Sequence, residues 1–315
     1  MQAKKNILVV RNPKAGQGSR LFENTMCALQ ETAQRLEVIE TQSAGHAEEI
    51  ARNAAEANEW DVLAVAGGDG TLNEAANGLI GSELPLGIIP VGTANVLARE
   101  IHLPMEAQGI ARTLQSGADI SIYPGLVNGR VFLMMAGAGF DGRVVSRVSQ
   151  KLKKYFGSGA YIISALTEIF SGPSPVIQAE INGSTHSASW IVVSNICFYG
   201  GSFCMAPSAH IETSGFVVTL FTSQTPWGRI RDILGVAINR SGVPWGARML
   251  SAKNVNLSGE DGVMQVDGDF VGPLPAVVEV SRQPLRLIIP RVLVTERVRF
   301  KSPVECTRLT SSIQG

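Results

Sequence analysis

Apolar runs and amphipathic stretches alternate along roughly the first 125 residues of the chain. A continuous apolar run predicts a buried strand over residues 6–10, and further strands are predicted over residues 36–41, 61–67 and 84–92. The spacing of apolar positions between them predicts helices over 19–35 and 46–58, and two more that begin within TLNEAANGLI and TANVLAREI. Because strand and helix alternate, this part of the chain is predicted to be an α/β domain with a mostly parallel sheet.

The pattern changes near Pro124 and Gly125, where short β-rich runs separated by turn residues replace the alternation. Such runs predict an antiparallel β-sandwich or barrel. Two helical stretches, around 142–171 and 226–240, interrupt these runs. We therefore expect one domain over residues 1–125 and a second over residues 126–287.

Composition narrows the class of protein. With 45% apolar and 17% charged residues, the chain of 315 residues is predicted to be globular and long enough for two domains. Basic and acidic residues number 27 each, so the basic excess that is usual in nucleic-acid-binding proteins is missing. The four cysteines lack zinc-site spacing, which predicts reduced thiols in a cytoplasmic protein. The longest apolar run, around VFLMMAGAGF, is far shorter than the ~20 residues of a membrane span, so membrane contact is predicted to be peripheral.

The stretch VAGGDGTLNEAANGL, residues 65–79, carries the strongest chemical signal. Gly67, Gly68 and Gly70 follow a predicted strand and precede a predicted helix, whose first N–H groups favour an anion. Asp69 would repel a bare phosphate, so its presence fits a divalent cation between the two, or a carboxylate that holds a hydroxyl or an amide. The alternative is a tight turn in which Asp69 or Thr71 caps the helix.

Two further loops repeat this arrangement. NPKAGQG, residues 12–18, follows the first predicted strand and contains Lys14, which could reach a phosphate. PVGTANVLARE, residues 90–100, places Gly92, Thr93 and Asn95 between a strand and a helix. Carboxyl ends of parallel strands meet at one edge of a sheet, so the three loops are predicted to converge there. The chain has no Walker A motif, and the GGDGT loop is not a GxGxxG turn, because its aspartate lies inside the glycine cluster.

Taken together, the motifs resemble the diacylglycerol kinase catalytic family, which includes bacterial lipid kinases and the sphingosine and ceramide kinases. The resemblance is carried by NPKAG, GGDGTLNEAANGL, PVGTANVLARE, AGAGFDGRVV and QVDGD, and covers residues 6 to about 290. NAD kinases share GGDGT, but usually not the following LNEAANGL together with an NP-x-x-G loop.

The resemblance implies an α/β domain that binds ATP, a β-sandwich that binds the lipid substrate, and a segment at about 288–305 that returns to the first domain. It implies transfer of the γ-phosphoryl group of ATP, with Mg²⁺, to a hydroxyl of a diacylglycerol- or sphingoid-like lipid. Asp69 would organise magnesium and phosphates, and Asp269, in Asp267-Gly268-Asp269, would be the catalytic base. The residues implied to line the ATP site are Asn12, Pro13, Lys14, Ala15, Gly16, Thr41, Gly67, Gly68, Asp69, Gly70, Thr71, Asn73 and Thr93.

Three segments depart from the family pattern. Tyr123 stands where an aspartate is usual, and a phenol, with a pKa near 10, does not replace a carboxylate. Thr213 and Ser214 stand where many bacterial members have a magnesium-binding aspartate. Val96 stands where the motif GTxND carries another acid. These departures indicate a different substrate, or weaker activity on ordinary diacylglycerol.

Several alternatives stay open. A soluble-substrate kinase of the NAD kinase type would share the GGDGT loop, and a nucleotide- or lipid-binding regulator without catalysis would fit Tyr123. Lys151, Lys153 and Lys154 form either a basic edge for anionic headgroups or a solvated helix end, and Asp141 either shapes a cleft or caps a helix. The expected partner is a lipid at a membrane surface, and a homodimer is an open question.

Overall fold

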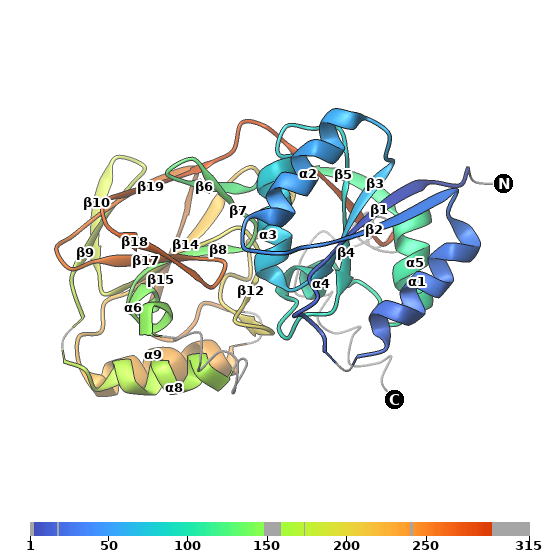
Figure 1. Cartoon of the computed structure of the whole chain (residues 1–315). Coiled ribbons are helices and arrows are strands. Elements are labelled where there is room, and N and C mark those ends of the chain that lie inside the picture. Colours follow the sequence, from blue (N-terminus) through green and yellow to red (C-terminus); the bar gives the residue numbers. More distant parts are fainter. Residues whose placement is uncertain (1–2, 18, 148–158, 173, 240–241, 292–315) are drawn as a thin grey trace. The chain divides into compact units, whose positions relative to one another are not determined.

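The structure is a computed structural model, and the chain in it divides into two compact units, residues 1–121 with 285–315 and residues 122–284 (Figure 1). The residues that the structure describes are 3–17, 19–147, 159–172, 174–239 and 242–291. The three lysines at 151, 153 and 154 and the segment 292–305 lie outside them.

The first unit is built on one six-stranded sheet with the strand order β2-β1-β3-β4-β20-β5. Its strands are β1 (Asn6–Arg11), β2 (Arg35–Glu40), β3 (Val62–Gly67), β4 (Leu86–Pro90), β5 (Ala118–Ile122) and β20 (Leu285–Ile289). The pairs β1–β2, β1–β3, β3–β4 and β4–β20 are parallel. This confirms the predicted α/β fold with a mostly parallel sheet.

Helices cover both faces of this sheet (Figure 1). They are α1 (Leu21–Thr32), α2 (His46–Ala57), α3 (Asp69–Leu79), α4 (Val96–Glu100) and α5 (Ala107–Ser116). Ile7 and Val9 of β1 belong to one buried cluster with Leu29 of α1 and Ile110 and Leu114 of α5. Because both faces are buried, the central strands are apolar at every position, which is why they read as continuous apolar runs.

The second unit contains two six-stranded sheets, with the orders β10-β9-β16-β19-β6-β7 and β15-β14-β11-β8-β17-β18. All of their pairings are antiparallel, and a buried apolar cluster draws on strands of both sheets, so the predicted β-sandwich is confirmed. The strands of the unit are β6 (Gly125–Val127), β7 (Arg130–Phe132), β8 (Met135–Gly139), β9 (Ile177–Ile181), β10 (Ser184–Ala188), β11 (Trp190–Ser194), β12 (Phe198–Tyr199), β13 (Phe203–Cys204), β14 (Phe216–Phe221), β15 (Ala247–Ala252), β16 (Asn254–Ser258), β17 (Val263–Val266), β18 (Asp269–Pro273) and β19 (Ala276–Val280).

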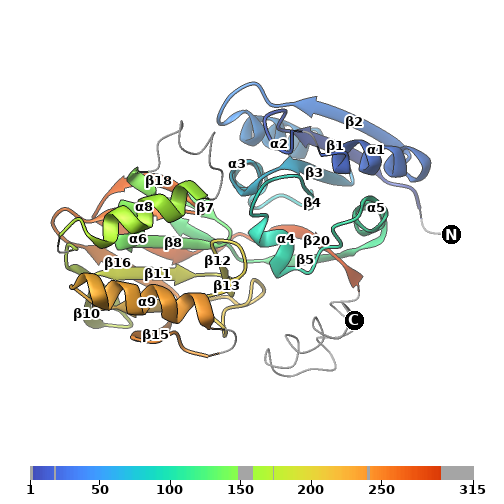
Figure 2. The same cartoon turned by 90° about the horizontal axis from the view of Figure 1, so that it is seen from below.

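Three helices lie on the outer side of the second sheet, and Figure 2 shows them together on one face of the unit. They are α6 (Phe140–Arg147), α8 (Gly159–Ile169) and α9 (Pro226–Ile238). In its described part, the stretch predicted to be helical around 142–171 contains two helices, α6 and α8, which pack against each other. Of the helices in the described part of the chain, none has the length and apolar character needed to cross a bilayer.

Candidate functional site

The loops predicted to converge do meet, because β1, β3 and β4 are neighbours in the sheet. The Asn12 side chain donates from Nδ2 to Thr71 Oγ1 at 3.0 Å, which links the loop after β1 to the first turn of α3. The Gly92 N–H donates to the Gly67 carbonyl at 3.1 Å and links the loop after β4 to the end of β3. The three predicted segments thus form one hydrogen-bonded cluster at the carboxyl edge of the sheet.

Two glycines let these loops approach closely. A Cβ atom on Gly92 would lie 2.5 Å from the Cα of Gly68 and 2.7 Å from Oδ1 of Asn95. In the first loop, Gly16 has a φ of +66°, and its Cβ would lie 2.8 Å from the Val91 carbonyl oxygen. These glycines are therefore needed for contact between the loops themselves, besides any approach to a ligand.

Asn95 shapes the loop between β4 and α4, although it was not among the predicted site residues. Its side chain is buried, and Nδ2 donates to the carbonyls of Pro90 at 3.1 Å and Gly92 at 2.8 Å. Its φ of +47° lies in the left-handed region, which asparagine tolerates better than most residues. That tolerance is the one feature by which the sequence could have indicated its role.

Asp69 reaches across to the next helix. Its Oδ1 accepts the N–H of Val96 at 3.0 Å, so the carboxylate caps the start of α4 rather than that of its own helix, α3. Burial raises the pKa of Asp69, and hydrogen bonds from the backbone N–H groups of Val96, Leu97 and Asn95 act in the opposite direction. The N-cap of α3 is Gly68, which has no side chain to accept a hydrogen bond. The first N–H groups of α3 are therefore suited to an anion.

The remaining predicted ATP-site residues surround this cluster. Lys14 is exposed, and its backbone N–H donates to Asn12 Oδ1 at 3.0 Å. The Ala15 N–H donates to the Asn12 carbonyl at 3.0 Å, which closes the turn that contains Pro13. Thr41 follows β2, and its N–H donates to the Arg11 carbonyl at 2.8 Å. The others are Gly70 in the first turn of α3, Asn73 further along α3, and Thr93, exposed in the loop after β4.

In the second unit, the two acids of Asp267-Gly268-Asp269 have different environments. Asp267 and Gly268 have φ values of +49° and +87°, as in a type I′ turn, and they join β17 to β18. The Asp267 carboxylate accepts three backbone N–H groups at 2.8–2.9 Å, those of Leu133, Met134 and Met135. Asp269 is the first residue of β18 and is exposed. Asp267 therefore belongs to a turn that its own carboxylate stabilises, while Asp269 is exposed to solvent.

A buried chain of side chains supports this turn. Gln265 of β17 accepts the Gly268 N–H at 2.8 Å and donates from Nε2 to Asp141 Oδ2 at 2.7 Å. The Tyr199 hydroxyl donates to the other oxygen of Asp141. Burial raises the pKa of Asp141, and the hydrogen bonds from Tyr199 and Gln265 act against that shift. Neither Tyr199 nor Gln265 was predicted, because each is far in sequence from Asp141.

The positions that depart from the family pattern are also placed. Tyr123 is half-buried between β5 and β6, and Thr213 and Ser214 belong to a turn in which the Thr213 N–H donates to the His210 carbonyl at 2.8 Å. Within the described ranges, no three His, Cys, Asp or Glu side chains gather as a metal-binding group. A Mg²⁺ ion would fit Asp69 through one carboxylate plus the phosphates of a nucleotide, which is a common mode for this ion.

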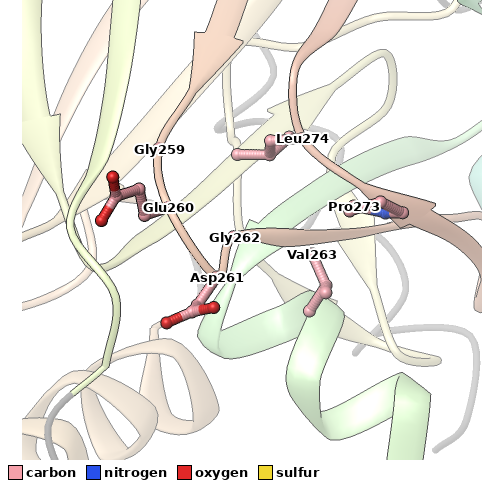
Figure 3. Close-up of a pocket in the computed structure, with 7 residues that line it drawn as sticks. All are labelled: Gly259, Glu260, Asp261, Gly262, Val263, Pro273 and Leu274. Atoms are coloured by element: carbon pink, nitrogen blue, oxygen red, sulfur yellow. The ribbon is translucent and has the colours of Figure 1, made fainter.

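A hollow of about 660 Å³ lies in the second unit, at the turn between β16 and β17 and the end of β18. Figure 3 shows the residues that line it. None of the predicted site residues lines it. A cavity of about 10 Å³ lies beside Gly67, Gly68 and Asp69, enough for about one water molecule. The candidate nucleotide site is therefore defined by backbone donors at the sheet edge rather than by an enclosed pocket.

These features define a class of protein: an α/β unit with glycine-rich loops clustered at the carboxyl ends of its strands, joined to an antiparallel β-sandwich unit. Residues 6–125 match the family model of the diacylglycerol kinase catalytic domain. Residues 134–289 match that of the YegS C-terminal NAD kinase beta sandwich-like domain. The chain belongs to the diacylglycerol kinase family.

Relatives span nearly the whole chain. A probable lipid kinase YegS-like of Pseudomonas aeruginosa is 31% identical over 82% of this chain and 89% of its own length. A diacylglycerol kinase of Staphylococcus carnosus is 25% identical over 91% of this chain and 96% of its own. A solved structure of a putative diacylglycerol kinase from Bacillus anthracis superposes with a TM-score of 0.77 at 22% identity, covering 92% of this chain and 99% of that one, and shows the shared fold.

Proposed function

We propose that this protein is an ATP-dependent lipid kinase that transfers the γ-phosphoryl group to a hydroxyl of a diacylglycerol- or sphingoid-like lipid. The observation that carries the proposal is the cluster of three loops at the edge of the parallel sheet, with uncapped N–H groups at the start of α3. The family and the names of its relatives support a lipid as the acceptor.

The donor side of the reaction is assigned to the first unit. The loop from Asn12 to Gly16, the segment from Gly67 to Asn73, and Thr41 and Thr93 would bind ATP. Backbone N–H groups and the Lys14 ammonium would neutralise charge on the phosphates. Mg²⁺, held by Asp69 and the phosphates, would add further positive charge where negative charge develops during transfer.

The acceptor side is assigned to Asp269. Its exposed carboxylate would take the proton of the lipid hydroxyl, whose oxygen forms the new bond to the γ-phosphorus while the bond to the bridging oxygen breaks and ADP leaves. Asp267 would hold the turn in place through its three backbone hydrogen bonds. We expect the departures at Tyr123, Thr213 and Ser214 to bear on which lipid is accepted.

The test uses the purified full chain with labelled ATP and Mg²⁺. Diacylglycerol, sphingosine, ceramide and monoacylglycerol are supplied in mixed micelles, and NAD is supplied alone as a soluble acceptor. Label in one lipid class, lost in Asp269→Asn, is the expected result. Label in NAD and in no lipid would refute the lipid assignment, and ATP binding without transfer to any acceptor would indicate a regulator.

A further inference from the structure

The helices α8 and α9 lie on one face of the second unit (Figure 2). Together with residues 242–245, they carry large apolar side chains in solvent. Two of them are tryptophans, Trp227 with 78% and Trp245 with 61% of its surface exposed. We call this surface the α8–α9 face, and its exposed apolar residues are Leu166, Phe170, Trp227, Leu234, Ile238 and Trp245.

Helical spacing places these residues in stripes. Trp227, Arg231, Leu234 and Ile238 are separated by four, three and four positions, so they share the solvent side of α9. Leu166 and Phe170, at the end of α8, are likewise four residues apart. The outer side of both helices is thus mainly apolar, the reverse of an ordinary surface helix.

Trp245 belongs to the same surface because its backbone packs on α9. A Cβ atom on Gly235 of α9 would lie 2.7 Å from the Trp245 backbone nitrogen. That position therefore requires glycine for the contact. The indole of Trp245 nevertheless remains largely in solvent, so it is held against the helix without being covered.

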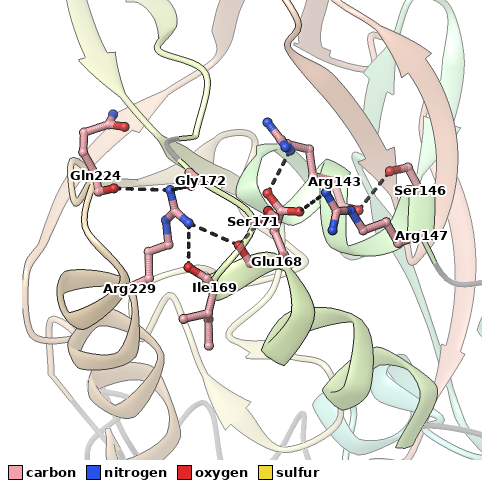
Figure 4. A network of polar contacts seen from close by, with 9 residues as sticks. All are labelled: Arg143, Ser146, Arg147, Glu168, Ile169, Ser171, Gly172, Gln224 and Arg229. Carbon is pink, nitrogen blue, oxygen red and sulfur yellow. Dashed lines mark hydrogen bonds and ion pairs between the residues drawn. The ribbon is translucent and has the colours of Figure 1, made fainter.

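Two charged side chains of these helices, Arg229 of α9 and Glu168 of α8, point inward instead (Figure 4). Arg229 of α9 is buried and donates to the carbonyls of Glu168 at 3.1 Å, Ile169 at 2.8 Å and Gly172 at 2.6 Å, which caps the end of α8 and fastens the two helices together. The Glu168 carboxylate is fully buried and pairs with Arg143 at 2.8 Å and Arg147 at 3.0 Å, both on α6. For a surface that contacts only water, burying charged pairs while exposing tryptophan and leucine side chains raises the free energy of the folded protein.

The charge that does reach solvent is basic. In the described parts of α6, α8 and α9, every acid is at most 3% exposed, namely Asp141, Glu168 and Asp232. The side chains of Arg147 and Arg231 are 37% and 55% exposed. An apolar face that exposes basic groups and buries its acids is complementary to an anionic lipid surface.

We propose that the α8–α9 face docks on a phospholipid bilayer with anionic headgroups, with Trp227 and Trp245 at the level of the headgroups. Indole rings favour that depth because they combine a large apolar ring with a polar N–H group. The proposal rests on the proposed function, since a kinase whose acceptor is a bilayer lipid must reach it there. The proposal assigns the contact with the bilayer to the α8–α9 face of the second unit.

The test is flotation of the full chain with vesicles of phosphatidylcholine alone or with phosphatidylglycerol. Wild type is expected to bind the anionic vesicles more tightly, and Trp227→Ser with Trp245→Ser to weaken this binding at least about tenfold, given the apolar area removed. A matched control, Met105→Ser with Val277→Ser, removes two apolar residues that are 48% and 47% exposed elsewhere and should leave binding unchanged. Equal losses in both variants, or none in the tryptophan variant, would overturn the proposal.

Activity measurements separate this proposal from the proposed function. The tryptophan variant should keep its turnover on lipid in detergent micelles and lose it on vesicles. Vesicle binding by wild type without phosphorylation of any lipid would refute the kinase assignment and leave the docking face intact. Kinase activity in micelles without vesicle binding, together with a dimer that the tryptophan variant converts to a monomer, would show that the face joins two copies and would refute docking.

Discussion

Changing Asp267 or Asp269 to asparagine is expected to affect different properties. The first change should lower stability, and the second should lower turnover. Asp267 accepts three backbone N–H groups, and Asp269 begins β18 in solvent. In Asp267→Asn, Oδ1 can still serve Met134 and Met135, but the new amide N–H₂ faces the Leu133 N–H. One charge-assisted bond is lost and one donor is left unpaired, which we expect to cost about 2–4 kcal/mol.

That loss corresponds to a fall in melting temperature of roughly 4–16 °C for a unit of this size. Asp269→Asn should change the stability by no more than about 0.5 kcal/mol, because the side chain is exposed. Its turnover should nevertheless fall about 10²–10⁴-fold, as for loss of a general base. The assays are thermal unfolding and labelled-phosphate transfer, the latter run below both melting temperatures.

Asp261→Asn provides the control, since Asp261 is exposed like Asp269 and lies in a turn with a positive φ, +56°, like Asp267. Neither its melting temperature nor its turnover should change. Should Asp267→Asn melt within about 1 °C of wild type, the three hydrogen bonds do not hold the turn. Should Asp269→Asn keep wild-type turnover, Asp269 is not the base.

Three further changes test the sheet edge and the buried acid. Gly92→Ala should lower the affinity for ATP and the stability of the fold, the latter by about 1–3 kcal/mol, because its Cβ would lie 2.5 Å from the Gly68 backbone. An unchanged nucleotide titration and an unchanged melting temperature would contradict close packing of the loops. Asp69→Asn should retain the cap on Val96 and lose phosphoryl transfer, whereas Asp69→Ala should also lose about 1 kcal/mol of stability; an active Asp69→Asn enzyme would exclude a role for the charge. The folded state raises the pKa of Asp141, so stability should fall as pH rises from the ordinary carboxyl value of about 4. Asp141→Asn should flatten that dependence in urea unfolding, and parallel curves for variant and wild type would refute it.

Local pattern was sufficient for most of the architecture. The strands β1, β3 and β4 are apolar at nearly every position because helices cover both sides of them, so the sequence alone indicates each of them. Strand β2 is mostly exposed and alternates charged with apolar residues, which also indicates a strand. The glycine-rich loops are equally visible, since close approach of backbones excludes other residues. Two elements of the first unit, α5 and β5, were not predicted. Helix α5 is only 10 residues long, and β5 is partly exposed, so neither produces a long apolar run.

Other features depend on residues far apart in the sequence. Strand β20, residues 285–289, pairs in parallel with β4 and lies between β4 and β5 in the first sheet, although it follows the whole sandwich. Its apolar composition would suit either sheet, so only the long-range pairing assigns it. The ion pairs of Glu168 with Arg143 and Arg147 likewise form between helices that are separate in sequence.

The sequence alone determined which segments form the α/β layer and the sandwich, and where the three glycine-rich loops lie, because these properties follow from local spacing and from glycine. Only the tertiary structure decided what each acid does. Asp69 caps α4, and Asp267 accepts the N–H of Met135 at the start of β8. Asp141 is buried and accepts hydrogen bonds from Tyr199 and Gln265. The sequence shows where an aspartate is but not its hydrogen-bond partners. Its role depends on the donors that folding places beside its carboxylate.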